Sequence, residues 1–178
     1  MGSKDKIIEY LTQPENLTFL LEIEPLIPKV KTYVFNKGFN LFDVEIQKKL
    51  WAGCKTANER DDFTISSEQY KSNEHFNLAV YLGEGDRNNY YGIIGSADHD
   101  DLIIKTNPMQ KIVNDFSMNN RWRHWAVWTY FRGDRREMLK SSDNMGNLIS
   151  EWVEEFCEFA EAVRPELDKI NNQHKKAK

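Results

Sequence analysis

The C-terminal part of the chain, from about Met145 onward, carries the most regular pattern in the sequence. Its apolar residues recur every three or four positions, at Leu148, Ile149, Trp152, Val153, Phe156, Phe159, Ala160 and Val163. This spacing gathers them on one face of an α-helix. The outer face carries Glu151, Glu154, Glu155, Glu158 and Glu161. The pattern predicts a long amphipathic helix over about residues 143–171, kinked or restarted at Pro165 and followed by a frayed basic tail.

The N-terminal part, residues 1 to about 52, is also predicted to be helical. A short helix over residues 5–11 precedes Pro14, and proline is favoured as the first residue of a helix. Pro25 and Pro28 form a joint, because both cannot lie inside one unbroken helix. A third helix is expected from about residue 28 to 50. Gly38 lies inside it, where it either bends the helix or lets another backbone approach.

The middle of the chain changes from helical to strand spacing. Residues 76–82 alternate apolar and smaller or polar side chains, which is typical of a strand. A glycine-rich turn at 83–89 leads to a second strand at 90–96, and 97–101 form a further turn before 102–105 extend or edge the sheet. The polar stretch 55–75 is predicted to be a loop with one short strand near Phe63 and Ile65.

Residues 108–131 complete the predicted core. A helix begins at Pro108, with apolar residues at Met109, Ile112, Val113 and Phe116. Residues 121–131 favour a strand, although the spacing of three between their tryptophans leaves a helix open. The order of elements predicts an α+β fold with N-terminal helices, a small antiparallel sheet with an inserted helix, and a long C-terminal helix. We expect one domain over 1–178, with 1–52 helical, 60–131 mainly sheet and 143–171 the long helix.

Composition excludes several classes of protein. The chain has 178 residues and a net charge of −4, so its overall field does not favour nucleic acid. No apolar run approaches the ~20 residues that span a membrane, and the N-terminus lacks the features of a secretory signal. We therefore expect a cytoplasmic protein in which Cys54 and Cys157 are reduced and chemically inert.

No motif predicts a cofactor or a catalytic site. The glycine patterns of nucleotide-binding loops and the G-x-S-x-G elbow of serine hydrolases are absent. The histidines are isolated from one another and from the cysteines, which disfavours zinc. Three carboxylates and a histidine lie together at Asp98, His99, Asp100 and Asp101. A solvated turn explains this cluster, and a site for Mg²⁺ or Mn²⁺ in a phosphoesterase is the alternative.

Three stretches of the sequence resemble a known family. The stretches "NNYYGIIGS" (88–96) and "RWRHWAVWTYF" (121–131), followed by the long helix, are similar to the C-terminal accessory region of bacterial and phage proteins of the PD-(D/E)XK nuclease-like superfamily. The opening "IIEYLTQPENLTFLLEIEPLIPKV" (7–30) resembles their connecting helices. The resemblance implies a helical segment followed by an aromatic-rich strand pair.

The catalytic motif of that superfamily is missing from this chain. Such a nuclease places an acidic residue two positions before a lysine, and no lysine here has Asp or Glu at that position. The nearest variant, Glu45-Ile46-Gln47, lies in a helical pattern. The resemblance therefore implies the accessory part alone, and no catalytic residue is carried over.

Residues 119–137 concentrate tryptophan and arginine, at Arg121, Trp122, Arg123, Trp125, Trp128, Arg132, Arg135 and Arg136. In one interpretation they only pack, with Trp125 and Phe131 facing the core and Trp128 on the other face. In a second they bind single-stranded nucleic acid by stacking. In a third they form a protein interface. We predict a non-catalytic recognition module that binds a protein in a phage or bacterial nuclease-like or defence-related system, and uses no cofactor.

Overall fold

The computed structural model divides the chain into two compact units, residues 1–37 and 38–178. It describes residues 3–50, 54–59, 62–67, 76–82, 89–95, 106–118, 120–122, 125–133, 135–140 and 142–176. For a few of these positions, including 54–59, 62–67, 120–122 and 135–136, it describes the backbone alone. The predicted turns at 83–89 and 97–101 and the predicted segment at 102–105 lie outside the described residues, apart from Asn89.

The first unit is helical, as predicted. Helix α1 (Ser3–Leu11) is followed by α2 (Pro14–Ile23), a short 3-10 helix η1 (Glu24–Leu26), and α3 (Ile27–Lys49), which continues into the second unit. Gln13 is extended, because the ring of Pro14 would clash with a helical backbone at the residue before it. Pro14 begins α2, where its missing N–H breaks no hydrogen bond of the helix. The two later prolines, Pro25 and Pro28, lie at the joint between α2 and α3, where the sequence places a break.

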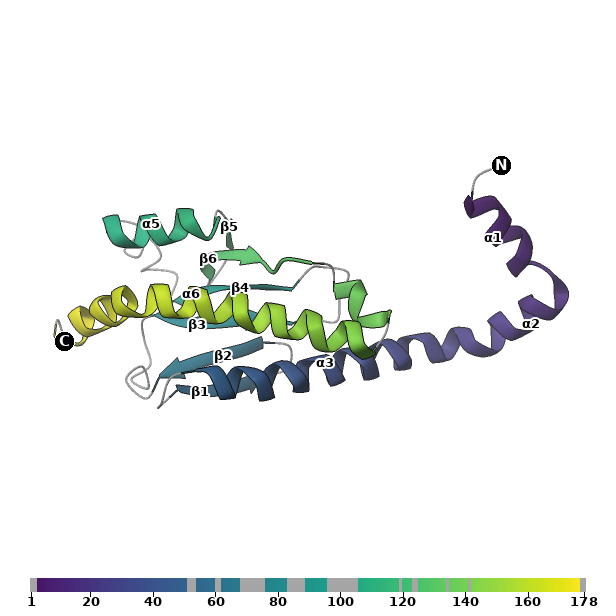
Figure 1. The fold of residues 1–178 in the computed structure, drawn as a ribbon, viewed down its shortest axis with the longest axis horizontal. Coiled ribbons are helices and arrows are strands. Elements are labelled where there is room, and N and C mark those ends of the chain that lie inside the picture. The colour runs from purple at the N-terminus through teal and green to yellow at the C-terminus, as the bar shows by residue number, and fades with distance from the viewer. Residues whose placement is uncertain are drawn as a thin grey trace. The chain divides into compact units, whose positions relative to one another are not determined.

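The second unit is built on a six-stranded antiparallel sheet in the order β1-β2-β3-β4-β6-β5 (Figure 1). Its strands are β1 (Cys54–Glu59), β2 (Asp62–Ser67), β3 (Phe76–Tyr81), β4 (Tyr90–Gly95), β5 (Asn120–Trp122) and β6 (Trp125–Tyr130). Helix α5 (Asn107–Asp115) lies between β4 and β5 in sequence. The long helix α6 (Ser142–Lys176) follows the short 3-10 helix η4 (Arg135–Leu139). This is the α+β fold that the sequence predicts.

Two details of the predicted sheet are wrong. Residues 54–59 and 62–67 form a pair of strands, β1 and β2, where a loop with one short strand was expected. Their sequence is mostly polar, so it lacks the apolar alternation that marks a half-buried strand. The stretch 121–131 is not one strand, and not a helix, but belongs to two strands that pair with each other, Asn120 opposite Trp128 and Trp122 opposite Trp125.

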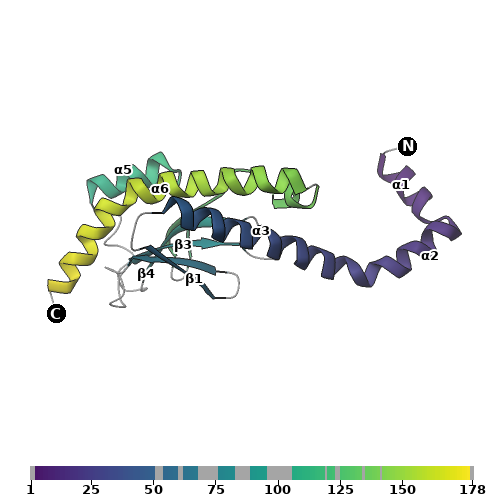
Figure 2. The same ribbon diagram turned by 60° about the horizontal axis from the view of Figure 1, so that its bottom comes forward.

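Helix α6 covers one face of the sheet, and its apolar stripe makes the main core (Figures 1 and 2). Trp152, Phe156 and Phe159 are almost fully buried. They meet the inward side chains of β3 and β4, and the Tyr91 ring lies 5.9 Å from Phe156 and 5.4 Å from Phe159. From α3, Phe42 packs edge-on against Phe131 at 6.1 Å. Burial of such aromatic side chains contributes about 2–3 kcal/mol each before entropy is counted.

The C-terminal end of α6 is more ordered than the sequence suggests. The helix runs without interruption through Pro165, and its last part bends in the view of Figure 2. Asn171, the first residue of the predicted frayed tail, is only 4% exposed. Its Nδ2 donates to the Phe76 carbonyl at 3.0 Å, and its Oδ1 accepts from the Phe76 amide at 3.1 Å. This pair of hydrogen bonds fixes α6 to the start of β3.

The opposite face of the sheet holds a second aromatic cluster. Tyr90 is its centre, with Tyr81 stacked at 4.7 Å, Trp125 at 4.9 Å and Trp128 at 4.8 Å. Trp125 was predicted to face the main core, on the side opposite Trp128. A register shift between Ile93 and Ile94, where β4 meets β6, brings both indoles against the same tyrosine.

Candidate functional site

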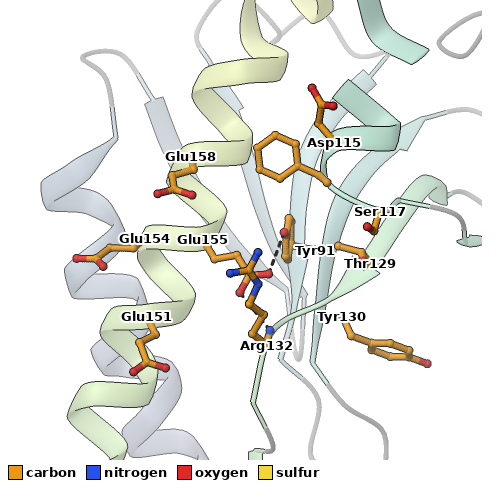
Figure 3. Close-up of a pocket in the computed structure, with 11 residues that line it drawn as sticks. Tyr91, Asp115, Ser117, Thr129, Tyr130, Arg132, Glu151, Glu154, Glu155 and Glu158 are labelled. Carbon is orange, nitrogen blue, oxygen red and sulfur yellow. Dashed lines mark hydrogen bonds between the residues drawn. The ribbon is translucent and has the colours of Figure 1, made fainter. Parts of the chain in front are cut away.

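A hollow of about 720 Å³ lies between α6, the end of α5 and the strands β4 and β6. Figure 3 shows its side chains, and we call it the acidic groove. It is lined by Tyr91, Asp115, Phe116, Ser117, Thr129, Tyr130, Arg132, Glu151, Glu154, Glu155 and Glu158. Among the lining residues that the structure describes, five are acidic and Arg132 is the only basic one.

Helix α6 supplies four of the acids because of their spacing. Glu151, Glu154, Glu155 and Glu158 stand at i, i+3, i+4 and i+7, which is one stripe of an α-helix. Like charges at such spacings destabilise a helix by about 0.2–0.5 kcal/mol per pair. The arrangement therefore carries a cost that a neighbouring cation would relieve.

Glu155 is the fixed member of this stripe. Its Oε1 accepts a hydrogen bond from the Tyr91 hydroxyl, and its Oε2 accepts one from the Arg132 backbone amide, both at 3.1 Å. Figure 3 shows Glu155 pointing at Tyr91, whereas Glu154 points away from it. Burial raises the pKa of the Tyr91 phenol well above its ordinary value, and the negative charge of Glu155 raises it further. The phenol therefore stays protonated and acts as a donor.

The segment after β6 is held in place from the same helix. The indole Nε1 of Trp152 donates to the Arg132 carbonyl at 2.7 Å. The Arg132 amide thus donates to Glu155 and the Arg132 carbonyl accepts from Trp152. Trp152 and Glu155 lie one turn apart on α6. This double attachment sets the backbone that carries the guanidinium into the groove.

The remaining acids differ in their partners. Glu154 forms an ion pair with Lys49 of α3, with Nζ and Oε1 3.0 Å apart. Among the residues that the structure describes, Asp115, Glu151 and Glu158 have no ion-pair partner. Glu151 and Glu158 are exposed. Their charge is therefore available to a cation that enters the groove.

The far wall of the groove comes from the turn that ends α5. The Ser117 amide donates to the Asn114 carbonyl at 3.0 Å and the Met118 amide to the Val113 carbonyl at 2.8 Å. Ser117 adopts the left-handed conformation, with φ of 54°. This is the Schellman arrangement that ends many helices, with serine where glycine is usual. It turns the chain so that Asp115, Phe116 and Ser117 all face the hollow.

Aromatic rings provide the apolar part of the lining. Phe116 packs against Phe159 at 5.4 Å, and the Tyr91 ring lies 4.6 Å from Phe131. Tyr130 is 44% exposed at the rim. Carboxylates beside aromatic rings suit the side chains of lysine and arginine, which combine an apolar stem with a cationic head.

Of the tryptophan and arginine residues singled out from the sequence, Arg132 is the only one with a described side chain that lines the groove. Trp125 is 3% exposed and Trp128 is partly buried, both in the cluster around Tyr90. The Trp128 indole nitrogen has no hydrogen-bond partner among the described residues. Arg121 and Trp122 lie in β5, and Arg135 and Arg136 begin η4, but only their backbone is described. Arg123 lies outside the described residues.

The structure does not test the alternative prediction of a site for Mg²⁺ or Mn²⁺. Asp98, His99, Asp100 and Asp101 all lie outside the described residues. Within the described ranges, no group of three or more His, Cys, Asp or Glu side chains is arranged to hold a metal ion. Cys157 is a free thiol whose pKa is raised by burial.

Sequence reasoning did not identify the groove. It assigned the glutamates of α6 to a solvated outer face, and Glu155 instead turns toward the sheet. The stripe at i, i+3, i+4 and i+7 was the available signal, but sequence does not show what stands opposite it. Among the described helices, none is long and apolar enough to cross a membrane. No family model, curated protein or solved structure matches this chain.

Proposed function

We propose that this chain is a non-catalytic, protein-binding module whose acidic groove receives a lysine- or arginine-bearing segment of the partner. The observation that carries the proposal is the charge of the groove, whose described lining has five carboxylates and one guanidinium. Surface potentials of one sign in a cleft attract ligands of the opposite sign and raise their local concentration.

The geometry also supports a side chain rather than a bare cation as the ligand. A hollow of about 720 Å³ is large enough for several side chains. The rings of Tyr91 and Phe116 offer apolar surface to the methylene stem, while Glu151 and Glu158 offer oxygen atoms to the charged end. The two fixed hydrogen bonds of Glu155 keep the floor of the groove in one shape.

The partner's identity stays a prediction that rests on the sequence. The resemblance to accessory regions of PD-(D/E)XK nuclease-like proteins suggests a phage or bacterial nuclease-like or defence-related system. Single-stranded nucleic acid is the alternative ligand, at the tryptophan and arginine residues of 121–136. The acidic groove disfavours that ligand on its own side of the sheet, because phosphates are repelled by carboxylates. A phosphoesterase that uses residues 98–101 is the third prediction.

Fluorescence anisotropy with the full chain tests the proposal. The probes are fluorescein-labelled hexalysine, hexaglutamate and a short oligodeoxythymidine. We expect hexalysine to bind, and its binding to weaken as salt rises, because exposed charges are screened. Glu158→Gln should weaken hexalysine binding by up to about fivefold, the factor that corresponds to 1 kcal/mol for an exposed ion pair.

Glu161→Gln is the matched control, because Glu161 is an exposed residue of α6 that does not line the groove. It removes the same charge from the same helix. Equal effects of Glu158→Gln and Glu161→Gln would show that only the net charge matters, and would contradict a groove site. Binding of the oligonucleotide but not of hexalysine would favour nucleic acid, and metal-dependent cleavage of it would favour the phosphoesterase.

A further inference from the structure

Most of the large apolar side chains that the structure describes as exposed belong to the first unit. Among the described residues, thirteen large hydrophobic side chains are exposed. Ten of them fall within the first unit, namely Ile7, Ile8, Tyr10, Leu17, Phe19, Leu21, Leu26, Ile27, Val30 and Tyr33. Isolated apolar residues on a surface are ordinary, but a concentration of this kind marks an interaction surface.

These side chains follow the helical repeat. Leu17 and Leu21 are one turn apart on α2, and Leu26, Val30 and Tyr33 follow at i, i+4 and i+7 from η1 into α3. No residue of α2 or η1 is buried. Helices of nine or ten residues are marginal in water without packing on an apolar face. The helices of the unit are therefore amphipathic, and packing of their apolar faces against another surface would stabilise them.

The charges of the same segment are segregated along the chain. Residues 14–25 contain Glu15, Glu22 and Glu24 and no basic residue, a net charge of −3. Residues 26–37 contain Lys29, Lys31 and Lys37 and no acid, a net charge of +3. The segment is neutral as a whole, and each half carries the opposite charge of the other.

We propose that residues 14–37 form the interface of a homodimer, in which the segment pairs antiparallel with the same segment of a second copy. An antiparallel pair places the acidic half of each copy beside the basic half of the other, twice, and joins the two apolar stripes between them. A two-fold interface requires this kind of self-complementarity. A parallel pair would instead set like charges side by side.

The charge pattern favours a second copy over a membrane surface as the cover. Helices that lie on anionic lipid have a polar face rich in lysine and arginine. Here the acidic half, residues 14–25, includes all of α2 and has a net charge of −3. The inference is independent of the acidic groove, whose lining lies wholly in the second unit.

Sedimentation velocity of the full chain over a dilution series tests the proposal. We expect a reversible monomer–dimer equilibrium. Leu21→Glu, at a side chain that is 63% exposed, should raise the dimer dissociation constant by at least about tenfold, because each dimer contains the change twice. Val44→Glu is the matched control, since Val44 is 50% exposed but belongs to the second unit. It should leave the dissociation constant within about twofold.

Charge reversal tests the antiparallel arrangement. Lys29→Glu with Lys31→Glu should weaken the dimer, and addition of Glu22→Lys and Glu24→Lys in the same chain should restore it, because complementarity returns with the signs exchanged. A monomer at every concentration would overturn the proposal. So would an unchanged dimer in the Leu21→Glu variant, or a dimer that the second pair of reversals weakens further. Binding of monomers to phosphatidylserine vesicles without dimerisation would identify a membrane as the cover and would also overturn it.

Discussion

Tyr91 and Glu155 join the central sheet to the long helix. The Tyr91 hydroxyl donates to the Glu155 Oε1 at 3.1 Å, while the Glu155 Oε2 accepts from the Arg132 amide at the same distance. Tyr91 is 1% exposed and its ring belongs to the core. A core residue thus sets the position of a charged residue in the groove.

Tyr91→Phe removes this donor and keeps the ring. We expect the free energy of unfolding to fall by about 1.5–3 kcal/mol, the usual range for a hydrogen bond to a charged group. Urea denaturation at neutral pH measures it. Thr129→Val, which alters another residue of the groove lining, is the control and should cost less. Equal stabilities of wild type and Tyr91→Phe would show that the hydrogen bond contributes nothing.

The raised pKa of Tyr91 predicts a pH dependence. An unfolded tyrosine ionises near pH 10, and the folded phenol ionises at higher pH because of burial and the charge of Glu155. The stabilisation is complete below pH 10 and decreases above it, since the unfolded state then loses a proton that the folded state keeps. The stability difference between wild type and Tyr91→Phe should therefore shrink between pH 9 and pH 11. A difference that grows over this range would contradict the assigned cause.

Three glycines should respond differently to alanine. At Gly92 an added Cβ would lie 2.1 Å from the Val127 carbonyl oxygen, which belongs to a paired strand, so we expect a loss of about 2–4 kcal/mol. At Gly146 nothing lies within 4 Å, so Gly146→Ala should stabilise α6 by about 0.5–1 kcal/mol. Gly38 should fall between them, because its neighbour is the flexible end of Met138. Urea denaturation of the three variants gives the order, and a mild effect at Gly92 would contradict it.

Ser117 offers a stabilising substitution at the groove wall. Its φ of 54° strains a residue with a Cβ, whereas glycine adopts this conformation freely. We expect Ser117→Gly to raise the free energy of unfolding by up to about 1 kcal/mol, since the larger entropy of unfolded glycine offsets part of the gain. Ser117→Val should do the opposite. Thermal unfolding of both variants checks the sign, and a lower midpoint for Ser117→Gly would exclude strain at this position.

Local patterns predicted most of the fold. Apolar spacing predicted the helices α1, α2, α3, α5 and α6 and the strands β3 and β4. Prolines also marked the starts of α2 and α5. Strands β1 and β2 were not predicted, because they form by pairing with neighbouring strands and show no apolar alternation in sequence. The antiparallel pairing of Trp122 with Trp125 was not predicted, because the sequence between them, Arg123-His124, contains none of the residues that typically mark a turn.

The acidic groove was not predicted from the sequence, for a different reason. Its residues come from β4, β6, the end of α5 and α6, and only the tertiary structure brings them together. The predicted surface of tryptophan and arginine contributes Arg132 to it, while Trp125 packs in the cluster on the other sheet face. The buried position of Asn171 was not predicted either, because its hydrogen-bond partner Phe76 is 95 positions away in sequence.

An NMR titration of the uniformly ¹⁵N-labelled full chain with hexalysine tests the proposed function most directly. The backbone amides of Arg132, Phe116 and Ser117 report on the groove, because these residues line it from two segments, the one after β6 and the turn that ends α5. Tyr81 and Ala79, on β3 in the aromatic cluster of the opposite face, serve as internal controls. If the acidic groove takes basic side chains, the three groove amides shift in a saturable manner, and Glu151→Gln with Glu158→Gln reduces the shifts. Shifts confined to Tyr81 and Ala79, or no shift at Arg132 at saturating peptide, would contradict it.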